Sequence, residues 1–507
     1  MRKFLLFMLI ITMALPFPFT LAAGKDVVIL NVGGDLANAL DAVADGGTIR
    51  IDGRYNIPKD FEWESHGKTV TFTGGILYFG GQKSLEIGDN VRFENIRLTF
   101  EDGSELYANG FDFYTHTDVT VSGQVNLYGG GKRTKVQQTN LTLMGGTFFN
   151  VYGGGNTGDV LGNVNVTVGG NFNKDLKISH AHEYQVFGGG HASTVHGNIQ
   201  LTFGGKARAN YIYGGCTSSI SRVKGHIQID FNGGKAMSIC GGSKDANQQC
   251  DVYLYFRGGE VQQIFGGCEK SSMIGNVLLY IDGGKITRRI YGGCYNNYTY
   301  DGWQKNPQYV YGNILLVLGE KANPTVNYGS DETIFAHSRQ VTYPKQESAH
   351  IAFTSKEAMN KLKGKIGPQD GTMKSILGNA KAYDGLHVLN YAASGNTITQ
   401  NCDRHDAATA TVAVSGSIYT GQPVENATVT VSENWLGPVP LVQYSDNIRV
   451  GIAKAMVTMG DTTLTVSFII WPPLWLCITA GTALLLIAGG TVTFIILRKK
   501  RTEKAAT

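Results

Sequence analysis

Apolar and polar residues alternate along a series of short segments in the middle of the chain. In residues 164–168, 199–203, 227–231, 252–256 and 277–281, the first, third and fifth positions are all aliphatic or aromatic. Because successive side chains of a strand point to opposite faces, this period of two predicts β-strands with one buried face.

Pairs of glycines separate these segments at regular intervals. Each repeat reads as a strand, a Gly-Gly pair, a few variable residues, an aliphatic residue, an aromatic residue and a second Gly-Gly pair. The second pairs begin at 129, 153, 188, 214, 241, 266 and 292, in steps of 24, 35, 26, 27, 25 and 26 residues. This period predicts the coils of a parallel β-solenoid, since a propeller blade needs about 40 residues. We expect glycine to supply a positive φ at every corner.

The regions on either side of the repeats have different patterns. In 35–56, Leu36, Leu40 and Val43 predict an amphipathic helix that caps the solenoid before a first strand at 48–51. After Leu318 the repeat weakens, and we interpret 321–405 as terminal coils, cap and linker, with a short helix at 355–363 and a strand at 385–391.

The sequence of the first coils, ADGGTIRIDGRYNI and KTVTFTGG within residues 44–75, resembles the pectin-lyase-like right-handed parallel β-helix superfamily. The IYGGC and IFGGC repeats resemble those of β-helix surface proteins of Gram-positive bacteria. Residues 409–470 look like a small bacterial Ig-like module. The resemblance implies an all-β chain, with a right-handed parallel β-helix over 26–320 at about 25 residues per coil, followed by an Ig-like β-sandwich.

The two ends of the chain predict export and membrane anchoring. Residues 1–22 have the charged start, apolar core and small-residue exit of a signal peptide. Residues 474–497 carry no charge, and a helix of that length would extend roughly 36 Å, enough to cross a hydrocarbon core of about 30 Å. The basic tail, 498–507, predicts a cytoplasmic C-terminus. We therefore expect a single-pass protein of the cell membrane with an extracellular N-terminal ectodomain and the membrane as a partner.

Charge and cysteine content exclude several functions. The net charge of +4 comes from the two basic ends, which leaves the intervening ectodomain near −2. Nucleic acid is therefore not an expected partner. The seven cysteines include no C-x-x-C pair, so the sequence shows no common zinc or redox motif, and we assign no metal and no cofactor.

Four histidines, His180, His182, His191 and His196, form the richest polar cluster. His180 and His182 alternate on one strand face, a spacing that metal ligands use. Since no recognised zinc motif accompanies them, the sequence favours a polar, exposed loop.

An enzyme on this fold would need catalytic groups on one face. Arg288 and Arg289 are candidate bases of a lyase, although one of them should face inward or pack at a corner. Asp230 and Asp282 are candidate hydrolase carboxylates, but we expect them two coils, or about 10 Å, apart. We assign no catalytic residue.

Cys216, Cys268 and Cys294 share one position of the repeat. They predict either a ladder of buried thiols, which burial preferences favour, or a disulfide between Cys268 and Cys294 on adjacent coils. The states of Cys240 and Cys250 stay open.

One aromatic series occupies the position before the second Gly-Gly pair. Its members are Tyr128, Tyr152, Phe187, Tyr213, Phe265 and Tyr291, with Cys240 substituting once. An outward series would form a stacking platform for carbohydrate, whereas an inward one would belong to the core, and the cysteine favours the core.

A second series lies on the outward positions of the repeat strands. These positions are polar at first and then become Tyr253, Tyr255, Leu278, Tyr280, Leu315 and Val317. Either residues 320–400 cover them, or the tyrosines bind a ligand. Our candidate ligand-binding residues are Tyr253, Tyr255 and Tyr280.

These patterns favour a non-catalytic, membrane-anchored surface protein of bacteria, an adhesin or a solenoid that binds a glycan or a cell-surface protein. The alternative is a membrane-anchored polysaccharide lyase or glycoside hydrolase of the β-helix fold. Fold alone does not distinguish the two.

Overall fold

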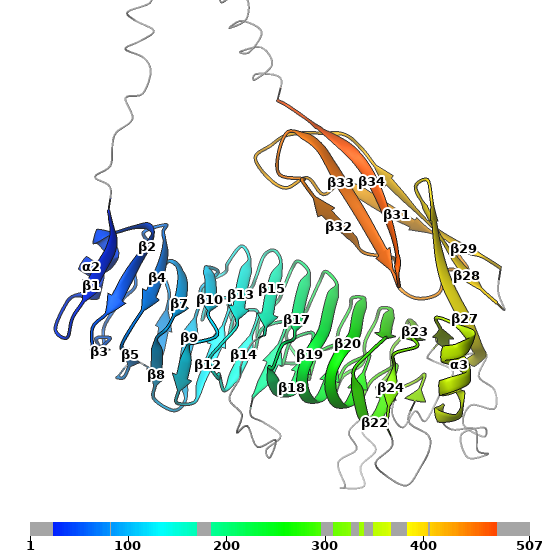
Figure 1. Cartoon of the computed structure of the whole chain (residues 1–507), viewed down its shortest axis with the longest axis horizontal. Coiled ribbons are helices and arrows are strands. Elements are labelled where there is room, and N and C mark those ends of the chain that lie inside the picture. Colours follow the sequence, from blue (N-terminus) through cyan, green and yellow to red (C-terminus); the bar gives the residue numbers. More distant parts are fainter. Residues whose placement is uncertain are drawn as a thin grey trace, which may run out of the picture. The chain divides into compact units, whose positions relative to one another are not determined.

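The computed structural model describes residues 24–81, 83–169, 184–295, 308–325, 334–338, 348–366, 383–403 and 406–473. The chain divides into two compact units (Figure 1). Unit 1 comprises Met1–Ile351 with Glu357–Leu386, and unit 2 comprises Ala352–Lys356 with His387–Thr507.

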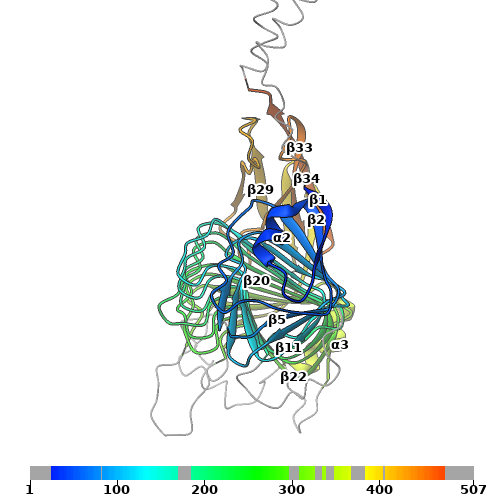
Figure 2. The same cartoon turned by 90° about the vertical axis from the view of Figure 1, so that its left-hand side faces the viewer.

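Unit 1 is a parallel β-solenoid, which confirms the fold predicted from the repeat. Its strands form ladders in which each coil pairs with the next, and Figure 2 views these coils along the stack. The first ladder contains β1 (Lys25–Leu30), β2 (Val43–Ile51), β4 (Thr69–Thr73), β7 (Asn90–Glu94), β10 (Asp112–Thr115), β13 (Thr139–Leu143), β15 (Val164–Val168), β17 (Ile199–Phe203), the start of β19 (Ile227–Cys240) and of β20 (Val252–Phe265), β21 (Val277–Ile281), β23 (Asn313–Leu318) and β26 (Ser348–Phe353).

The other two sides of the coil are built in the same way. The second ladder begins with β3 (Arg54–Asn56), β5 (Ile76–Phe79), β8 (Arg97–Phe100) and β11 (Thr120–Ser122). The third contains β6 (Ser84–Glu86), β9 (Ser104–Tyr107), β12 (Val125–Tyr128), β14 (Asn150–Tyr152), β16 (Gln185–Phe187), the ends of β18 (Arg208–Tyr213), β19, β20 and β22 (Lys285–Tyr291), and β25 (Ile334–Phe335). β24 (Asn323–Pro324) pairs with the start of β22.

In-register pairing places the same repeat position of every coil in one column. Val166 pairs with Leu201, and Phe203 with Phe231. The predicted inward residues of these strands are buried. Phe203 and Phe231 stack with ring centroids 5.2 Å apart. Burial of such columns is the main favourable contribution to the stability of the coil.

The glycine pairs serve two different purposes, and the prediction of positive φ at every corner is wrong for one of them. The corner after the first ladder does use positive φ, for example at Gly234 and Gly259, with φ of 82° and 78°. At the corner after the third ladder, coils approach closely instead. A Cβ on Gly241 would overlap the carbonyl oxygen of Gly266 in the next coil.

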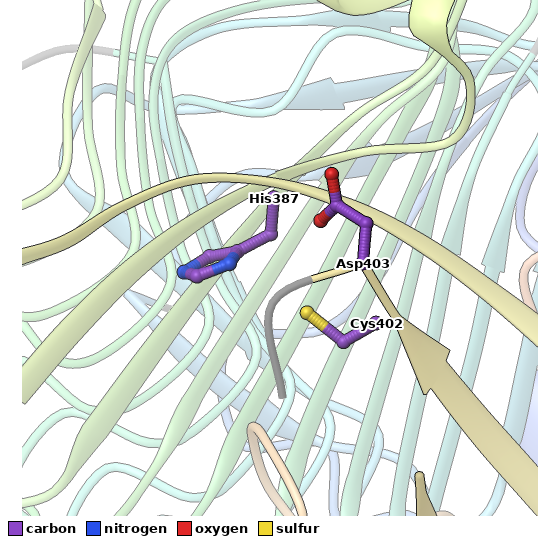
Figure 3. Close-up of side chains that lie close together, drawn as sticks. All are labelled: His387, Cys402 and Asp403. Atoms are coloured by element: carbon purple, nitrogen blue, oxygen red, sulfur yellow. The ribbon is translucent and has the colours of Figure 1, made fainter. Parts of the chain in front are cut away.

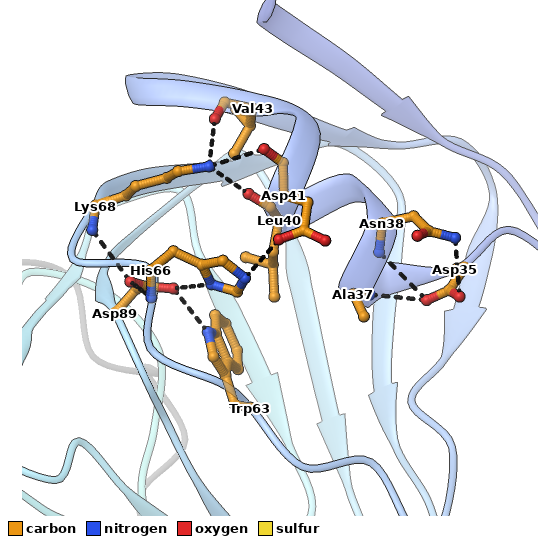
Figure 4. A network of polar contacts seen from close by, with 10 residues as sticks. All are labelled: Asp35, Ala37, Asn38, Leu40, Asp41, Val43, Trp63, His66, Lys68 and Asp89. Atoms are coloured by element: carbon orange, nitrogen blue, oxygen red, sulfur yellow. Dashed lines mark hydrogen bonds and ion pairs between the residues drawn. The ribbon is translucent and has the colours of Figure 1, made fainter. Parts of the chain in front are cut away.

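The N-terminal end of the solenoid is capped as predicted, by α2 (Leu36–Ala42). Asp35 accepts hydrogen bonds from the backbone N–H groups of Ala37 at 2.8 Å and Asn38 at 3.4 Å, which satisfies the start of the helix. Lys68 Nζ donates to three carbonyl oxygens at the other end, those of Leu40, Asp41 and Val43, at 2.8–2.9 Å (Figure 4). The strand β1, which pairs with β2, was not predicted.

A buried carboxylate fixes the loop beside this cap. Asp89 is fully buried and accepts hydrogen bonds from Trp63 Nε1, from the backbone N–H groups of His66 and Lys68, and from His66 Nδ1, at 2.9–3.1 Å (Figure 4). Burial acts to raise the pKa of Asp89, but these hydrogen bonds outweigh burial and lower it. The folded state therefore favours the ionised form.

The C-terminal part of unit 1 continues the ladders. β23 pairs with β26, and β22 pairs with β24 and β25. The short helix expected at 355–363 is α3 (Lys356–Leu362), followed by the 3-10 turn η2 (Lys363–Lys365).

Unit 2 is also built of β-strands. β27 (Tyr383–Ser394), β28 (Thr397–Cys402), β29 (Ala408–Val414) and β31 (Ala427–Val431) pair antiparallel in that order. β32 (Val442–Ser445), β33 (Gly451–Met459) and β34 (Thr462–Trp471) also pair antiparallel, and β30 (Ser417–Ile418) lies parallel to β34. The strand expected at 385–391 exists as part of β27, which pairs with β28.

The predicted transmembrane helix requires a correction. In the part of the chain that the structure describes, α2 and α3 have seven residues each, and no helix is long and apolar enough to cross a membrane. Seven residues of helix extend about 10 Å, against about 30 Å of hydrocarbon. The membrane as a partner, the single-pass topology and the cell-membrane localisation are therefore not supported. The predicted signal peptide (1–22), spanning helix (474–497) and tail (498–507) lie outside the described residues.

Replacement of Asp89 should destabilise the N-terminal end of unit 1. We expect Asp89→Asn to lower the free energy of unfolding by about 1.5–3 kcal/mol at pH 7, because an amide cannot accept all four hydrogen bonds. The stabilisation is present above the ordinary carboxyl pKa and is lost as the pH falls through the lowered value. The difference from the wild type should therefore shrink in acid, as measured by urea unfolding monitored by tryptophan fluorescence.

Asp118→Asn is the matched control for this experiment. Asp118 also pairs with a histidine, His116, at 2.8 Å, but its side chain is 44% exposed. Its replacement should cost less than about 1 kcal/mol. Equal losses in the two variants would show that the buried network has no special role.

The close approach at the third corner gives a second prediction. Gly241→Ala should lower the free energy of unfolding by about 1–3 kcal/mol, because the new methyl group overlaps the next coil. At Gly204 a Cβ would lie 4.0 Å from Asn232 Cβ, so Gly204→Ala should change stability by less than about 0.5 kcal/mol. The urea midpoints of the two variants measure this difference. If Gly241→Ala is tolerated as well as Gly204→Ala, close approach of the coils is not the reason for glycine at this corner.

Candidate functional site

A column of stacked aromatic rings follows the third ladder. It contains Tyr107, Tyr128, Tyr152, Phe187, Tyr213, Phe265, Tyr291 and Phe335, with Cys240 in one position. Neighbouring rings that stack directly have centroids 4.6–5.1 Å apart and planes within 14° of parallel. From Tyr107 to Tyr291 these side chains are at most 7% exposed. This burial confirms that the series belongs to a core, but the inward position expected of a core series is wrong.

The rings nevertheless lie on the outer side of their strands. The aliphatic residue before each ring, such as Val151 before Tyr152, is also buried, and successive side chains of a strand point to opposite faces. The rings contact the loops that follow the Gly-Gly pairs. Tyr152 meets the ring of His191 edge to face at 5.9 Å, and Asn156 Nδ2 donates to Tyr107 Oη at 3.0 Å. The aromatic column is thus a second core layer between the third ladder and these loops.

A row of polar residues borders the column on its strand side. These residues precede each ring by two positions and align in register, and we call them the strand row: Glu105, Asn126, Asn150, Gln185, Tyr211, Ser238, Gln263 and Arg289. Asn150 Nδ2 donates to Asn126 Oδ1 at 3.1 Å, and the backbone N–H of Gln185 donates to Asn150 Oδ1 at 3.1 Å. The row is therefore held by bonds between coils.

The loops supply a matching row on the other side. It consists of the residue directly after each Gly-Gly-x triplet, and we call it the loop row: Lys132, Asn156, His191, Thr217, Lys244, Glu269 and Tyr295. Backbone hydrogen bonds stack these loops, for example from His191 to Gly155 at 3.0 Å and from Lys270 to Lys244 at 2.8 Å. Equivalent loop positions thus also align from coil to coil.

The two rows border an open pocket of about 640 Å³, which we call the polar pocket. Its lining comes from several coils: Asn150, Tyr152, Gln185, His191, Thr217, Ser218, Ser219, Lys244 and Asp245. Lys244 Nζ reaches across to Gln185 Oε1 at 3.4 Å, and its ammonium lies 6.0 Å from the centroid of the Tyr213 ring. The lining combines amides, hydroxyls, one imidazole and a charge of each sign.

Burial tunes the two basic groups of the pocket. It lowers the pKa of His191, with Glu105 opposing and Lys244 reinforcing the shift. At pH 7 the imidazole is therefore neutral and offers one donor and one acceptor. Burial also lowers the pKa of Lys244, and Glu269 opposes this.

A buried acid outside the pocket lining, Glu269, acts on Lys244. The hydroxyl of Tyr213 donates to Glu269 Oε2, and both side chains are buried. Burial is the main cause that raises the pKa of Tyr213 well above its ordinary value, and the negative charge of Glu269 raises it further. The phenol therefore remains a neutral donor. Glu269 is thus engaged in holding the aromatic column.

Mixed charges continue along the stack. Glu105 Oε2 accepts a hydrogen bond from Tyr107 at 2.9 Å and lies 3.8 Å from Lys132 Nζ. Neither sign of charge predominates on this side of the solenoid, which disfavours a polyanionic ligand.

The predicted ligand-binding tyrosines lie on the first ladder. Tyr255 and Tyr280 are aligned in register, with ring centroids 6.1 Å apart. Tyr253 and Tyr280 are 3% and 6% exposed, and Arg257 lies over the Tyr255 ring at 4.4 Å. These three side chains therefore offer no exposed surface on which a ligand could stack. Ligand binding by them stays a prediction.

The predicted histidine cluster is only partly described. His180 and His182 lie outside the described residues. His191 lines the polar pocket, whereas His196 Nε2 lies 3.8 Å from Asp159 and its Nδ1 lies 3.2 Å from Lys224 Nζ.

The candidate catalytic residues do not share a face in the expected way. Asp230 pairs in register with Tyr255. Its Oδ1 forms an ion pair with Arg257 Nη1 at 2.7 Å. Asp282 follows β21 and accepts from the backbone N–H of Lys321 at 3.2 Å. Arg288 and Arg289 are both exposed, because a register shift between Val261 and Gln263 accommodates the extra residue of β22.

The cysteines of the repeat form a buried column, as the favoured alternative predicted. Cys216, Cys268 and Cys294 are fully buried thiols that form no disulfide, and the column includes Ser243, whose Oγ accepts from Cys216 N at 2.9 Å. Burial raises the pKa of Cys216 to about 12, whereas a hydrogen bond with Cys294 lowers the pKa of Cys268. Cys240 and Cys250 are also buried and free.

The sequence analysis missed the loop row and hence the polar pocket. A signal did exist, because the residue after each Gly-Gly-x triplet is polar or aromatic throughout. Its meaning depends on the loops folding back over the aromatic column, which the strand periodicity does not indicate.

Comparison with known proteins adds nothing to this picture: no family model, no curated protein and no solved structure matches the chain significantly. The solenoid assignment therefore rests on the strand ladders themselves.

The Tyr213–Glu269 contact gives a prediction about the aromatic column. Tyr213→Phe should lower the free energy of unfolding by about 1.5–3 kcal/mol, because it removes a hydrogen bond to a buried carboxylate. Tyr152→Phe, which alters a neighbouring ring at the pocket edge, should cost less than about 1 kcal/mol. Urea unfolding of both variants tests this, and an equal effect would contradict a special role for Glu269.

Proposed function

We propose that the chain is a non-catalytic glycan-binding solenoid and that the polar pocket is its binding site. The observation that carries this proposal is the convergence of Asn150, Gln185, His191 and Lys244 over the buried aromatic column. These side chains belong to three coils of one in-register stack, so the backbone preorganises them.

The chemistry of the lining suits a ligand rich in hydroxyl groups. Amide groups both donate and accept, as do the hydroxyls of Ser218 and Ser219 and the neutral His191. Sugar hydroxyls have the same dual character, and a site that bonds each of them discriminates well against ligands that lack them. The pocket is of the size usual for small-ligand sites, about 300–1,000 Å³.

The direction of the rows favours an oligosaccharide. Both rows run along the stack and repeat once per coil, at about 4.8 Å. This repeat is comparable with the length of one sugar ring, so successive sugars of a chain would meet successive coils. Stacking on aromatic faces contributes little here, because neighbouring rings cover the faces of the column.

The arrangement of acids favours binding over turnover. Glu269 is buried and accepts from Tyr213, whereas Asp245 lies 3.8 Å from Lys270. Glycoside hydrolysis requires two carboxyl groups that flank one bond, and Glu269 is committed to the aromatic column. The alternative function, a polysaccharide lyase or glycoside hydrolase, is one possible outcome of the test below.

The finer parts of the proposal rest on sequence resemblance. They are export by the signal peptide at 1–22, an adhesin role, the likeness to pectin-lyase-like β-helix surface proteins of Gram-positive bacteria, and the Ig-like character of 409–470. Binding of a protein ligand on the side of the solenoid where Tyr253 and Tyr280 lie is also one of these sequence-based parts of the proposal.

A glycan array followed by calorimetry tests the proposal. We expect the purified chain to bind neutral oligosaccharides and Gln185→Ala to weaken binding by about tenfold or more, which corresponds to about 1.4 kcal/mol. Gln263→Ala is the matched control, since it removes the same side chain from the strand row outside the pocket lining. Both variants should retain the circular dichroism of the wild type.

Four results would overturn this function. Binding to no glycan, or equal loss in Gln185→Ala and Gln263→Ala, would exclude the polar pocket. Loss of binding in Tyr253→Phe or Tyr280→Phe alone would move the site to the first ladder. Release of reducing ends or unsaturated products during incubation with polysaccharides would show an enzyme.

A further inference from the structure

Three side chains of types that can ligate a metal ion meet at one end of a strand pair in unit 2. They are His387 on β27, Cys402 at the end of β28 and Asp403 directly after it. One ligand atom of each, an imidazole nitrogen, the thiol sulfur and a carboxylate oxygen, all lie within 4.8 Å of one another. Figure 3 shows the three side chains gathered around a common point between the two strands.

The strand pairing produces this arrangement. β27 and β28 are antiparallel neighbours, with Leu389 opposite Cys402. Beyond this pair, the backbone N–H of Val388 donates to Asp403 Oδ1 at 2.8 Å, and the N–H of Asp403 donates to the carbonyl oxygen of Val388 at 3.2 Å. The carboxylate is therefore oriented by the backbone, as the outer partners of metal ligands usually are.

The three ligand residues differ in their exposure to solvent. His387 is fully buried, Cys402 is partly exposed, and Asp403 is exposed. A buried imidazole provides a fixed ligand, and the partly exposed thiol and exposed carboxylate leave a route by which an ion can enter. Such an entry path is one requirement of a working metal site.

The ligand types select the class of ion. Nitrogen, sulfur and oxygen together suit a borderline ion such as Zn²⁺, whereas Mg²⁺ and Ca²⁺ require mainly oxygen ligands. Bonds of 2.0–2.3 Å in a tetrahedron place ligands about 3.3–3.8 Å apart. Small side-chain rotations bring donors within 4.8 Å to that separation.

We propose that His387, Cys402 and Asp403 form a binding site for a single Zn²⁺ ion, with water in the fourth position. On binding, the Cys402 thiol releases its proton to solvent and coordinates as a thiolate. The ion joins the start of β27 to the end of β28. No metal was assigned from the sequence. His387 and Cys402 are 15 positions apart and belong to no recognised motif.

The test uses the full chain, stripped of metal with a chelator and kept reduced. Titration with Zn²⁺ against a chromophoric competitor should give one ion per chain, and Co²⁺ as a probe should give a thiolate-to-cobalt charge-transfer band. Mg²⁺ and Ca²⁺ should not compete. Cys402→Ser should abolish the band and weaken Zn²⁺ binding by more than about tenfold, since even outer partners of metal sites contribute that much.

Two further variants separate metal binding from folding. Asp403→Asn keeps an oxygen that can accept from Val388 and should retain the charge-transfer band while weakening Zn²⁺ binding about tenfold or more. Cys250→Ser, which removes a buried thiol of unit 1, should bind Zn²⁺ like the wild type.

Alkylation provides a readout that does not depend on a folded Cys402 variant. Zn²⁺ should slow the reaction of Cys402 with iodoacetamide in the wild type, as followed by peptide mass spectrometry, and protect it less in Asp403→Asn. Absence of binding, of protection, or of any difference between Cys402→Ser and Cys250→Ser would each overturn the proposal.

Discussion

Close contact between consecutive coils is the constraint on which unit 1 depends. Parallel strands must lie about 4.8 Å apart to complete their hydrogen bonds. The chain turns back into the next coil at the corner after the third ladder, where a Cβ on Gly153, Gly188 or Gly214 would overlap a carbonyl oxygen of the next coil. Glycine at this corner therefore allows the stack to keep one register, and every column of equivalent residues follows from it.

The columns give the solenoid two layers rather than one. Aliphatic residues such as Val151 and Ile212 fill the inside of the coils, while the aromatic column packs on the outer side of the same strands. Loops held by coil-to-coil hydrogen bonds cover the rings. A site built on such a scaffold is rigid, because each lining residue is fixed by the coils above and below it. The polar pocket has this property, and we place the proposed glycan site there for that reason.

Unit 2 is organised differently, because most of its strands pair antiparallel with strands that are close in sequence. One of its apolar clusters contains five buried residues, Val424, Ala453, Ala455, Phe468 and Ile470. A metal ion that joins β27 and β28 would add a local constraint of the kind that small β-units with limited cores often use. The two proposed sites belong to separate units and rely on different chemistry, so each stands or fails by itself.

Much of unit 1 is determined by local sequence. Period-two alternation and the spacing of Gly-Gly pairs specify the strands, the coil length and the buried thiol column, and Asp35 with Leu36 and Leu40 specifies the capping helix. These features depend on neighbours within a few residues, or on an exact repeat, which is why they were predictable. The expected spanning helix was not supported, and the reason for glycine at the third corner was misjudged, because the close approach occurs between residues about 25 positions apart.

Only the tertiary structure decided which residues meet. In the sequence, Tyr253 and Tyr280 occupy outward positions, yet the structure buries them. Gln185 and His191 of one coil instead meet Lys244 of another. His387 and Cys402 likewise meet through strand pairing. Sequence determines which face of its own strand a side chain occupies, but the loops and strands that cover that face come from distant parts of the chain, and their positions are set by packing.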